Sequence, residues 1–377
     1  MSEAFDQADE LGPAKIIHVY EPTHQLKGIL VVDNVACGPA IGGLRMAPDV
    51  STGECARLAR AMTLKNAAAG LSHGGAKSVL FGDPRMPLQE KEQLIRAFAC
   101  ALKGNDEYIF GPDMGTDETC MAWVQDELGG RAVGLPRTLG GIPLDELGAT
   151  GWGLSSAVDA AMEYVDFTLD GARLVIQGFG SVGIHAARFL VERGAVVVAV
   201  ADSRGAIHSP GGLDLEKLIR LKSDGRGVNE YPQGEKLQRD AVVGVPCDIW
   251  IPAARPDVVH GGNVDQMDAR LVVQGANIPF TREAEQRLHQ RGVLVIPDFI
   301  ANAGGVICGA MEYRHMSQGA AFQAIAEKVG NNTREVLERA GSQQVPPRQA
   351  AETMAVERVQ GAMATRRWNL FWWHRPR

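Results

Sequence analysis

The sequence predicts an α/β protein of two domains, one of which is a doubly wound, Rossmann-type domain with a mostly parallel sheet. Three observations support this prediction. Residues 172–202 have the pattern strand, glycine turn, helix, strand, which is that of a βαβ unit. Further apolar strands are expected in CDIWIPAA, ARLVVQGAN and GVLVIPD, and they alternate with helical segments. The length of 377 residues suffices for two domains of ordinary size.

The composition is typical of a soluble globular protein, with 45% hydrophobic and 22% charged residues. The net charge is −7 and no basic face is evident, which argues against a nucleic-acid partner. No run of 18 apolar residues predicts a membrane span, and the start MSEAFDQADELG lacks the apolar core of a signal peptide. The six cysteines lack CxxC or metal-binding spacing, so we expect reduced thiols, no metal site and a cytoplasmic location.

The first part of the chain is expected to begin with two strands, IIHVYEP and KGILVVDNVAC. A helix is predicted over 52–69, because Ser51 and Glu54 have the capping-box spacing. A second helix is expected over 88–103, and YIFGPDMGTDE is typical of a strand that runs into a loop and a helix. The segment GGRAVGLPRTLGGIPLDELGA is rich in glycine and proline, so we expect a hinge there, followed by a helix over 152–165.

Two lysines stand in the apolar, glycine-punctuated stretch MTLKNAAAGLSHGGAK. Lys65 falls on the apolar face of the predicted helix, where an ammonium group needs a partner or a lowered pKa. Lys77 is expected on a loop, after glycines that let the backbone pass close to a ligand. Two lysines at one apolar cleft suit an anionic substrate and amine or imine chemistry. The alternative for each lysine alone is a surface salt bridge.

The clearest binding motif is Gly178-x-Gly180-x-x-Gly183, which follows one strand and opens a helix. The helix N-terminus offers free N–H groups and a positive dipole end to a pyrophosphate. Asp202 ends the next strand, where a carboxylate can accept hydrogen bonds from a ribose 2′-hydroxyl. That carboxylate should repel a 2′-phosphate, so we expect NAD, with NADP as the alternative because Arg204 follows closely. A strand–helix turn without a ligand is the other interpretation.

Seven motifs, in the same order, resemble the glutamate/leucine/phenylalanine/valine dehydrogenase family, and more closely its leucine, phenylalanine and valine branch. They cover roughly residues 28–315 and are GPAIGGLRMAPDV, MTLKNAAAGLSHGGAK, FGPDMGTDE, GATGWG, QGFGSVG, VVQGAN and PDFIANAGGV. The resemblance implies NAD(P)-dependent, reversible oxidative deamination of an L-amino acid to a 2-oxo acid and ammonia, by a homo-oligomer.

The resemblance also implies how the domains are arranged. It places an α/β domain for substrate binding and oligomerisation at 1–138 and an NAD-binding Rossmann domain at 139–325. Helices at 326–364 are expected to return to the first domain. For residues 365–377, which include RRWNLFWWHRPR, we expect a flexible tail, with a membrane-surface or partner-binding peptide as the alternative.

Individual roles follow from the same resemblance. Lys77 matches the catalytic lysine that activates water, Asp113 the carboxylate that carries protons to and from the amino group, and Lys65 the lysine that binds the α-carboxylate. Further substrate positions at the α-carbon end are Gly42, Gly43 and Asn302. The expected cofactor positions are Thr150, Gly178, Gly180, Ser181, Val182, Gly183, Asp202, Ser203, Ala276 and Asn277.

The chemistry of these residue types agrees with those roles. When hydride leaves the α-carbon and an iminium forms, positive charge develops on the substrate nitrogen, and Asp113 is a suitable proton acceptor. Water must then add to the iminium carbon, and a lysine near other cations or partly desolvated can act as the base. One departure from the family is Ala76, where a third glycine is usual. Its methyl group fits if the backbone there is not at positive φ.

The side-chain pocket is expected to be apolar. Glutamate-specific relatives place a lysine before GGLR and a serine seven residues after the NAGG asparagine, where this chain has Ile41 and Gly309. Because burying an unpaired carboxylate is costly, we expect a branched-chain or aromatic substrate. The expected lining is Ile41, Gly111, Val306 and Gly309, and the two glycines suggest room for a bulky group. Two alternatives stay open: a glutamate dehydrogenase with other side-chain ligands, and a catalytically weak regulatory relative that binds NAD and an amino acid.

Overall fold

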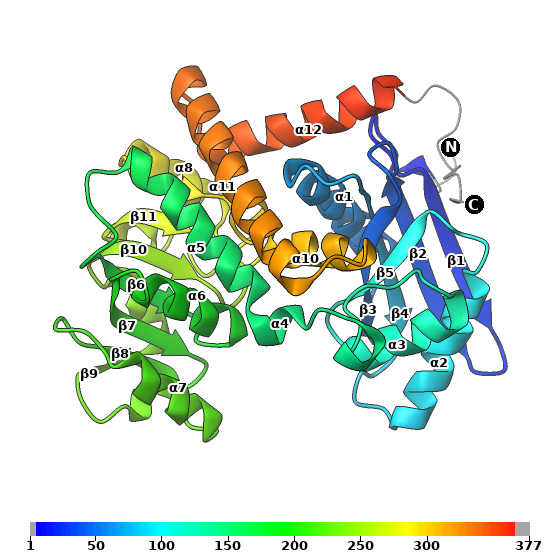
Figure 1. Cartoon of the computed structure of the whole chain (residues 1–377), viewed down its shortest axis with the longest axis horizontal. Helices are drawn as coiled ribbons and strands as arrows, with labels where there is room; N and C mark the ends of the chain where they lie inside the picture. Colours follow the sequence, from blue (N-terminus) through cyan, green and yellow to red (C-terminus); the bar gives the residue numbers. More distant parts are fainter. Residues whose placement is uncertain (1–4, 366–377) are drawn as a thin grey trace. The chain divides into compact units, whose positions relative to one another are not determined.

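The chain forms two compact units in a computed structural model that describes residues 5–365 (Figure 1). Among these residues, unit 1 takes in 5–143, 306–321 and 353–365, and unit 2 takes in 144–305 and 322–352. Each unit has a sheet of its own with helices packed on it, so the predicted two-domain α/β fold is confirmed.

Unit 1 contains a five-stranded mixed sheet. Its strands, in spatial order, are β1 (Lys15–Glu21), β2 (Leu26–Asn34), β4 (Gly74–Phe81), β3 (Ala40–Ala47) and β5 (Tyr108–Pro112). Strand β2 runs antiparallel to both of its neighbours, β1 and β4, whereas β3 runs parallel to both β4 and β5. The helices of this part are α1 (Thr52–Ala68), α2 (Leu88–Ala101), α3 (Glu118–Leu128) and the 3-10 turn η2 (Arg137–Leu139).

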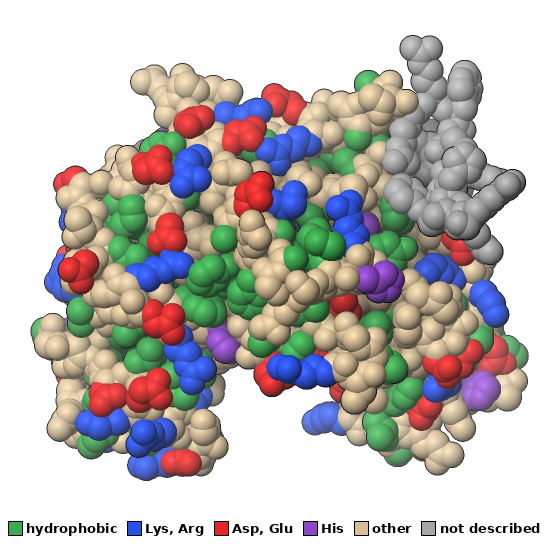
Figure 2. Space-filling view, viewed as in Figure 1, with side chains coloured by type: hydrophobic (Ala, Val, Ile, Leu, Met, Phe, Trp, Pro, Cys, Tyr) green, Lys and Arg blue, Asp and Glu red, His purple; other side chains and the backbone are tan. Residues whose placement is uncertain are grey.

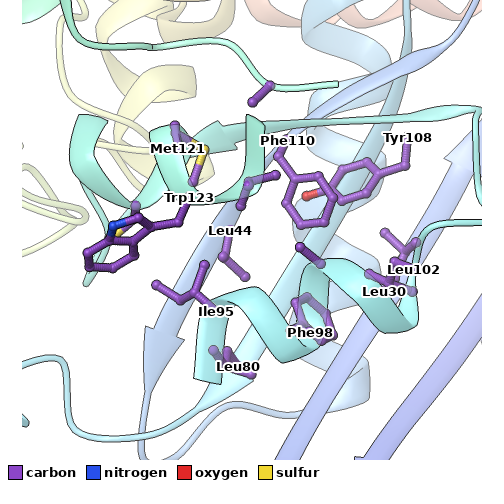
Figure 3. Close-up of a cluster of buried hydrophobic side chains, with 14 of the residues drawn as sticks. Leu30, Leu44, Leu80, Ile95, Phe98, Leu102, Tyr108, Phe110, Met121 and Trp123 are labelled. Atoms are coloured by element: carbon purple, nitrogen blue, oxygen red, sulfur yellow. The ribbon is translucent and has the colours of Figure 1, made fainter. Parts of the chain in front are cut away.

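The sheet of unit 1 is buried on both faces, because helices pack on each face and successive residues of β2 point to opposite sides. Leu30 belongs to the cluster under α2 and α3, and Val31 belongs to the cluster under α1. Figure 3 shows Phe98 of α2 and Trp123 of α3 among the strand residues of the larger cluster. This two-sided burial explains the apolar run ILVV in the middle of β2.

Unit 2 contains a seven-stranded sheet. Its strands, in spatial order, are β12 (Leu294–Ile296), β11 (Ala269–Val273), β10 (Cys247–Pro252), β6 (Arg173–Gln177), β7 (Val196–Asp202), β8 (Gly205–His208) and β9 (Glu235–Leu237). The strands from β12 to β7 are parallel, and β8 and β9 are antiparallel additions at one edge. The chain turns to opposite sides of β6, which creates the switch point where doubly wound folds bind nucleotides.

The helices of unit 2 alternate with its strands. They are α4 (Leu144–Leu147), α5 (Ala149–Ala161), η3 (Met162–Tyr164), α6 (Ser181–Val191), α7 (Leu215–Ser223), η4 (Val228–Glu230), η5 (Arg239–Gly244), η6 (Val264–Gln266), α8 (Arg282–Gln290) and α9 (Asp298–Ala301). The last three helices of the chain, α10 (Gly304–Tyr313), α11 (Gln318–Gln343) and α12 (Pro347–Thr365), are divided between the units.

This division differs from the predicted domain ranges. The first boundary follows Pro143 instead of residue 138, and residues 306–321 group with unit 1. Residues 322–352 group with unit 2, because Phe322 O accepts a hydrogen bond from Trp152 Nε1 at 2.9 Å. The last part of α12 groups with unit 1, where Arg358 donates to Ala68 O at 2.6 Å. The tail expected at 365–377 lies outside the described residues from position 366 onward.

The predicted N-cap of α1 is confirmed for Ser51, whereas the Glu54 side chain, the other half of the predicted capping box, accepts a hydrogen bond from Arg45. Ser51 Oγ accepts a hydrogen bond from Glu54 N at 3.2 Å, and α1 begins at Thr52, directly after Ser51. Within residues 5–365, none of the helices is both long and apolar enough to cross a membrane. On the face shown in Figure 2, lysines and arginines are interspersed with aspartates and glutamates over both units.

Candidate active site

The predicted catalytic pair, Lys77 and Asp113, comes together in unit 1. Lys77 Nζ lies 2.9 Å from Asp113 Oδ2, and the lysine side chain is 7% exposed. Lys77 is in the middle of β4 and Asp113 directly follows β5, and both strands are hydrogen-bonded to β3. Two strands that flank the same parallel partner therefore deliver the ammonium and the carboxylate to one place.

The expected loop around Lys77 is wrong, because Gly74, Gly75, Ala76 and Lys77 are all part of β4. The glycines there allow close packing: a Cβ on Gly74 would collide with Asn34 O, and one on Gly75 would collide with Thr63 N of α1. The departure at Ala76 is accommodated, since this residue pairs with Val32 in the sheet and is fully buried in the core.

Arg45 of β3 is a third member of the cluster that the sequence analysis missed. Its Nε lies 2.9 Å from Asp113 Oδ2, and its Nη1 donates to Glu54 Oε1 at 2.6 Å. Burial raises the pKa of Asp113, but Lys77 and Arg45 outweigh it, and the pKa lies below its ordinary value. Asp113 is therefore ionised, as its predicted role of proton acceptor requires. Arg45 is the arginine of the GGLR motif, and this position was the signal in the sequence that could have identified it.

The two glycines of β3 have different roles. A Cβ on Gly43 would lie 2.8 Å from Asp113 Cβ and 3.2 Å from Lys77 Nζ, so this glycine lies directly against the catalytic pair. A Cβ on Gly42 would collide with Ala76 O, so this glycine is required by the packing of β3 on β4. Gly43 therefore lets Asp113 and Lys77 pack closely against β3, while Gly42 lets β4 pack closely against β3.

Lys65 lies in the last turn of α1 and is half-buried. The next residue, Asn66, is fully buried and donates from Nδ2 to Gly74 O at 2.7 Å. This bond holds the end of α1 against the start of β4. The role of Lys65 in binding the α-carboxylate stays a prediction.

The expected side-chain pocket contains an additional wall residue, Val133. Its Cγ2 would lie 3.5 Å from a Cβ on Gly111 and 3.4 Å from one on Gly309. The room expected beside these glycines is therefore partly filled by a valine that no sequence pattern indicated. Ile41 is buried in β3, and Val306 is half-buried, three residues before Gly309 on α10. Residues three apart share a helix face, so Val306 is placed to line the same pocket.

The glycine turn of unit 2 fits a dinucleotide. Gly178 has φ +106°, and a Cβ there would lie 2.6 Å from the carbonyl carbon of Ala253. A Cβ on Gly183 would collide with Gly178 O, which explains the third glycine. At Gly180, the residue before α6, a Cβ would meet nothing within 4 Å. The N-terminus of α6, with Ser181 and Val182 in its first turn, therefore has open space beside it, as a pyrophosphate requires.

Asp202 ends β7 as predicted, but its oxygens are already engaged. Oδ2 accepts from Lys222 Nζ at 2.7 Å and from Val228 N at 3.1 Å, and Oδ1 accepts from Arg204 N at 2.8 Å. Burial raises the pKa of Asp202, but Lys222 and the two backbone N–H groups lower it by more than burial raises it. The pKa therefore lies below its ordinary value, and the carboxylate is ionised. Lys222, which sequence reasoning missed, offsets the charge expected to repel a 2′-phosphate. Ser203 follows in the same turn.

Two residues predicted near the nicotinamide, Asn277 and Asn302, are in contact. Asn302 Nδ2 donates to Asn277 Oδ1 at 3.1 Å and to Gly275 O at 3.2 Å, while its own Oδ1 is buried without a hydrogen-bond partner. An unpartnered buried acceptor fits a polar ligand group. Ala276 N is held by Pro252 O at 2.8 Å, and a Cβ on Gly305 would lie 3.3 Å from Thr150 Oγ1.

Comparisons with known proteins agree with this geometry. Residues 15–129 match the family described as Glu/Leu/Phe/Val dehydrogenase, dimerisation domain, and residues 140–367 match Glutamate/Leucine/Phenylalanine/Valine dehydrogenase. The NADP(+)-dependent glutamate dehydrogenase of Pyrobaculum calidifontis is 36% identical over 94% of this chain and 92% of its own. The NAD-specific glutamate dehydrogenase of Staphylococcus aureus is 34% identical over 89% of this chain and 85% of its own.

Among solved structures, this one is similar to the hetero-hexameric glutamate dehydrogenase of Thermus thermophilus in its Leu-bound form. The TM-score is 0.83 with 31% identity, over 94% of this chain and 90% of that chain. These relatives do not support the expected preference for an apolar substrate, and they leave the branch of the family open. The matches span both units, and the chain therefore belongs to the glutamate/leucine/phenylalanine/valine dehydrogenase family and is an amino acid dehydrogenase that uses a nicotinamide dinucleotide.

Proposed function

We propose that this chain catalyses the reversible, NAD-dependent oxidative deamination of an L-amino acid to the 2-oxo acid and ammonia. The observation that supports it is the contact between Lys77 Nζ and Asp113 Oδ2 at 2.9 Å, which packs against Gly43, where a side chain would collide with the pair. A base and a lysine at one partly buried point are the two groups that the reaction needs at the α-carbon.

Each of the site residues has a separate role in the proposed reaction. The nicotinamide cofactor supplies the hydride acceptor when bound. Asp113, kept ionised by Lys77 and Arg45, accepts a proton from the amino group as the substrate nitrogen becomes positive. Lys77 orients the water that adds to the iminium carbon and, once it has passed its own proton to solvent, accepts a proton from that water, while Lys65 holds the α-carboxylate. In unit 2, the N-terminus of α6 would hold the pyrophosphate.

Glutamate is the first candidate substrate, because the relatives that cover most of this chain at 34–36% identity are glutamate dehydrogenases. Its γ-carboxylate would need hydrogen-bond donors from elsewhere, because the side chain of Ile41 is apolar and Gly309 has none.

An apolar L-amino acid is the second candidate, and the lining of the pocket favours it. Ile41, Val306 and Val133 present only hydrocarbon, and Gly309 has no side chain. Because Val133 narrows the space beside Gly111 and Gly309, branched-chain substrates suit this pocket better than aromatic ones.

One experiment decides among these candidates. The protein is mixed with NAD or NADP and each of the twenty L-amino acids at alkaline pH, and NADH or NADPH formation is followed by absorbance. The highest kcat/KM with glutamate supports the first candidate, and the highest with leucine, valine or isoleucine supports the second. No turnover with any amino acid, with nucleotide binding retained, would overturn the proposed activity and favour a regulatory relative.

The cofactor preference and the assembly are part of the same proposal. NAD is favoured by the carboxylate of Asp202 at the end of β7, and NADP is the alternative that Lys222 and Arg204 support. A homo-oligomer is supported by the match of residues 15–129 to a dimerisation domain and by the hexameric relative. Light scattering of the purified protein would give the number of subunits.

A further inference from the structure

We propose that Glu312 is a positioning residue for the substrate side chain, because its carboxylate fixes the segment 134–142 and thereby keeps Val133 between Gly111 and Gly309. This inference rests on the proposed function, since it concerns the pocket that the substrate side chain would occupy. All of these residues belong to unit 1.

The carboxylate of Glu312 is buried and is held by backbone donors. Its Oε1 accepts from Leu135 N and its Oε2 from Ile142 N, each at 3.0 Å, and the residue is 6% exposed. No lysine, arginine or histidine within residues 5–365 forms an ion pair with it. Burial raises the pKa of Glu312, and the bonds from the backbone N–H groups act in the opposite direction. Burying a carboxylate without a cation costs free energy. The two hydrogen bonds from Leu135 N and Ile142 N offset part of this cost and tie both ends of the segment to Glu312.

The segment that Glu312 holds is irregular and depends on such ties. It contains Gly134 at φ +72° and Gly140 at φ +81°, with the short turn η2 between them. Its N-terminal end is fixed to the sheet, where Val133 N donates to Phe110 O at 2.8 Å. The rest of the segment is neither helix nor strand, so the bonds to Glu312 replace the regular hydrogen bonds that it lacks.

The segment begins beside the expected pocket and packs against Pro112, the residue before Asp113. Val133 Cγ2 packs beside Gly111 and Gly309, and a Cβ on Gly134 would lie 2.6 Å from Pro112 Cδ. Pro112 is the residue before Asp113, but the Asp113 carboxylate is held by Lys77 and Arg45, so a shift of Gly134 should affect the pocket more than the catalytic pair. Gly309 and Glu312 are three residues apart on α10, so one helix supplies both a wall of the pocket and the tie that holds the opposite wall.

The test compares Glu312→Ala and Glu312→Gln with the wild type in the full chain. Hydrogen–deuterium exchange without substrate should be faster over 134–142 in Glu312→Ala. The KM for the best amino acid should rise about tenfold, with kcat changed by less than about threefold, because the loss affects binding geometry. Affinity for NADH, measured by fluorescence, should stay the same. Glu312→Gln keeps one acceptor oxygen but turns an NH2 group toward the second backbone N–H, so it should recover only part of both effects.

The matched control is Glu107→Gln, which alters another buried carboxylate of unit 1 that pairs with Lys15. It should lower the melting temperature without changing exchange over 134–142 or the KM. Unchanged exchange or unchanged KM in Glu312→Ala would overturn the inference. If Glu312→Ala does not fold, Glu312→Asp, one methylene shorter, is held to the same two criteria. A wild type without turnover refutes the proposed function instead, and exchange together with calorimetric affinity for amino acids then decides the role of Glu312.

Discussion

Arg45 and Asp113 form an ion pair in which Nε lies 2.9 Å from Oδ2, the same oxygen that Lys77 Nζ contacts at 2.9 Å. Two cations on one carboxylate oxygen keep Asp113 ionised although it is largely withdrawn from water. Arg45 is itself held by Glu54 of α1. The pKa of the proposed proton acceptor is thus lowered by a side chain of β3, Arg45, as well as by one of β4, Lys77.

Removing the charge of Arg45 should change the pH dependence of the reaction. In Arg45→Met the pKa of Asp113 should rise, because one of the two cations that lower it is gone. Asp113 acts in its ionised form, so the acid limb of the kcat/KM profile should move to higher pH. Arg45→Lys keeps the charge and should move the limb less, and Glu54→Gln controls for the carboxylate left unpaired. An acid limb that stays in place in Arg45→Met would contradict the role of Arg45.

Lys77→Ala should reduce kcat by about 10²- to 10⁴-fold, the range expected when a general acid–base group is lost. Affinity for NADH should not change, since the glycine turn and Asp202 belong to unit 2 whereas Lys77 belongs to unit 1. Lys77→Arg should not restore turnover, because a larger group does not fit between Asp113 and Gly43. Stopped-flow turnover and fluorescence titration check both statements. Near-normal turnover in Lys77→Ala would refute the assignment.

The double variant Ile41→Lys/Gly309→Ser should move preference toward glutamate. A Cβ at position 309 would lie 3.4 Å from Val133 Cγ2, an ordinary contact, so serine is accommodated. The lysine supplies the cation that the pocket lacks, and the ratio of kcat/KM for glutamate to that for leucine should rise by about tenfold or more. Ile41→Met is the matched control and should leave the ratio near that of the wild type. A wild type that already prefers glutamate would show that the pocket argument is wrong.

Lys222→Met should make the protein reject NADPH more strongly. The variant leaves the buried carboxylate of Asp202 without its lysine, so repulsion of a 2′-phosphate increases, and the ratio of NADPH to NADH affinity should fall about tenfold. Asp202→Asn should shift the ratio the other way, because the negative charge is removed while the side-chain shape is kept. Fluorescence titrations with both nucleotides measure the ratio. Unchanged NADH affinity in Asp202→Ala would count against a role for this residue in binding the ribose.

Local patterns predicted much of this fold because they depend on near neighbours in the sequence. The cap at Ser51, the βαβ unit and the end of β7 at Asp202 are all set within a few residues or one strand–helix turn. The Lys77–Asp113 pair was predicted through the family resemblance. Its placement in a strand was not, because Gly75 looks like a loop residue until α1 is packed against it.

The missed residues share a physical reason. Val133, Lys222 and Glu312 act on positions far away in the sequence, and their local surroundings have no distinctive spacing. Lys222, for example, lies on α7 among other charged residues and is recognisable only by its contact with Asp202. Contacts of this kind require the three-dimensional packing and leave no periodic signal.

The division of unit 1 into separate stretches of chain has a consequence for its synthesis. Residues 5–143 contain Lys77 and Asp113, whereas Val306, Gly309 and Glu312 are translated only after residues 144–305. Since nascent domains fold in the order in which they leave the ribosome, the Lys77–Asp113 pair can form early, while the residues proposed to line the side-chain pocket are added late. A chain that ended before residue 306 would thus contain the proposed acid–base pair without the proposed pocket residues Val306 and Gly309 or the proposed tie at Glu312.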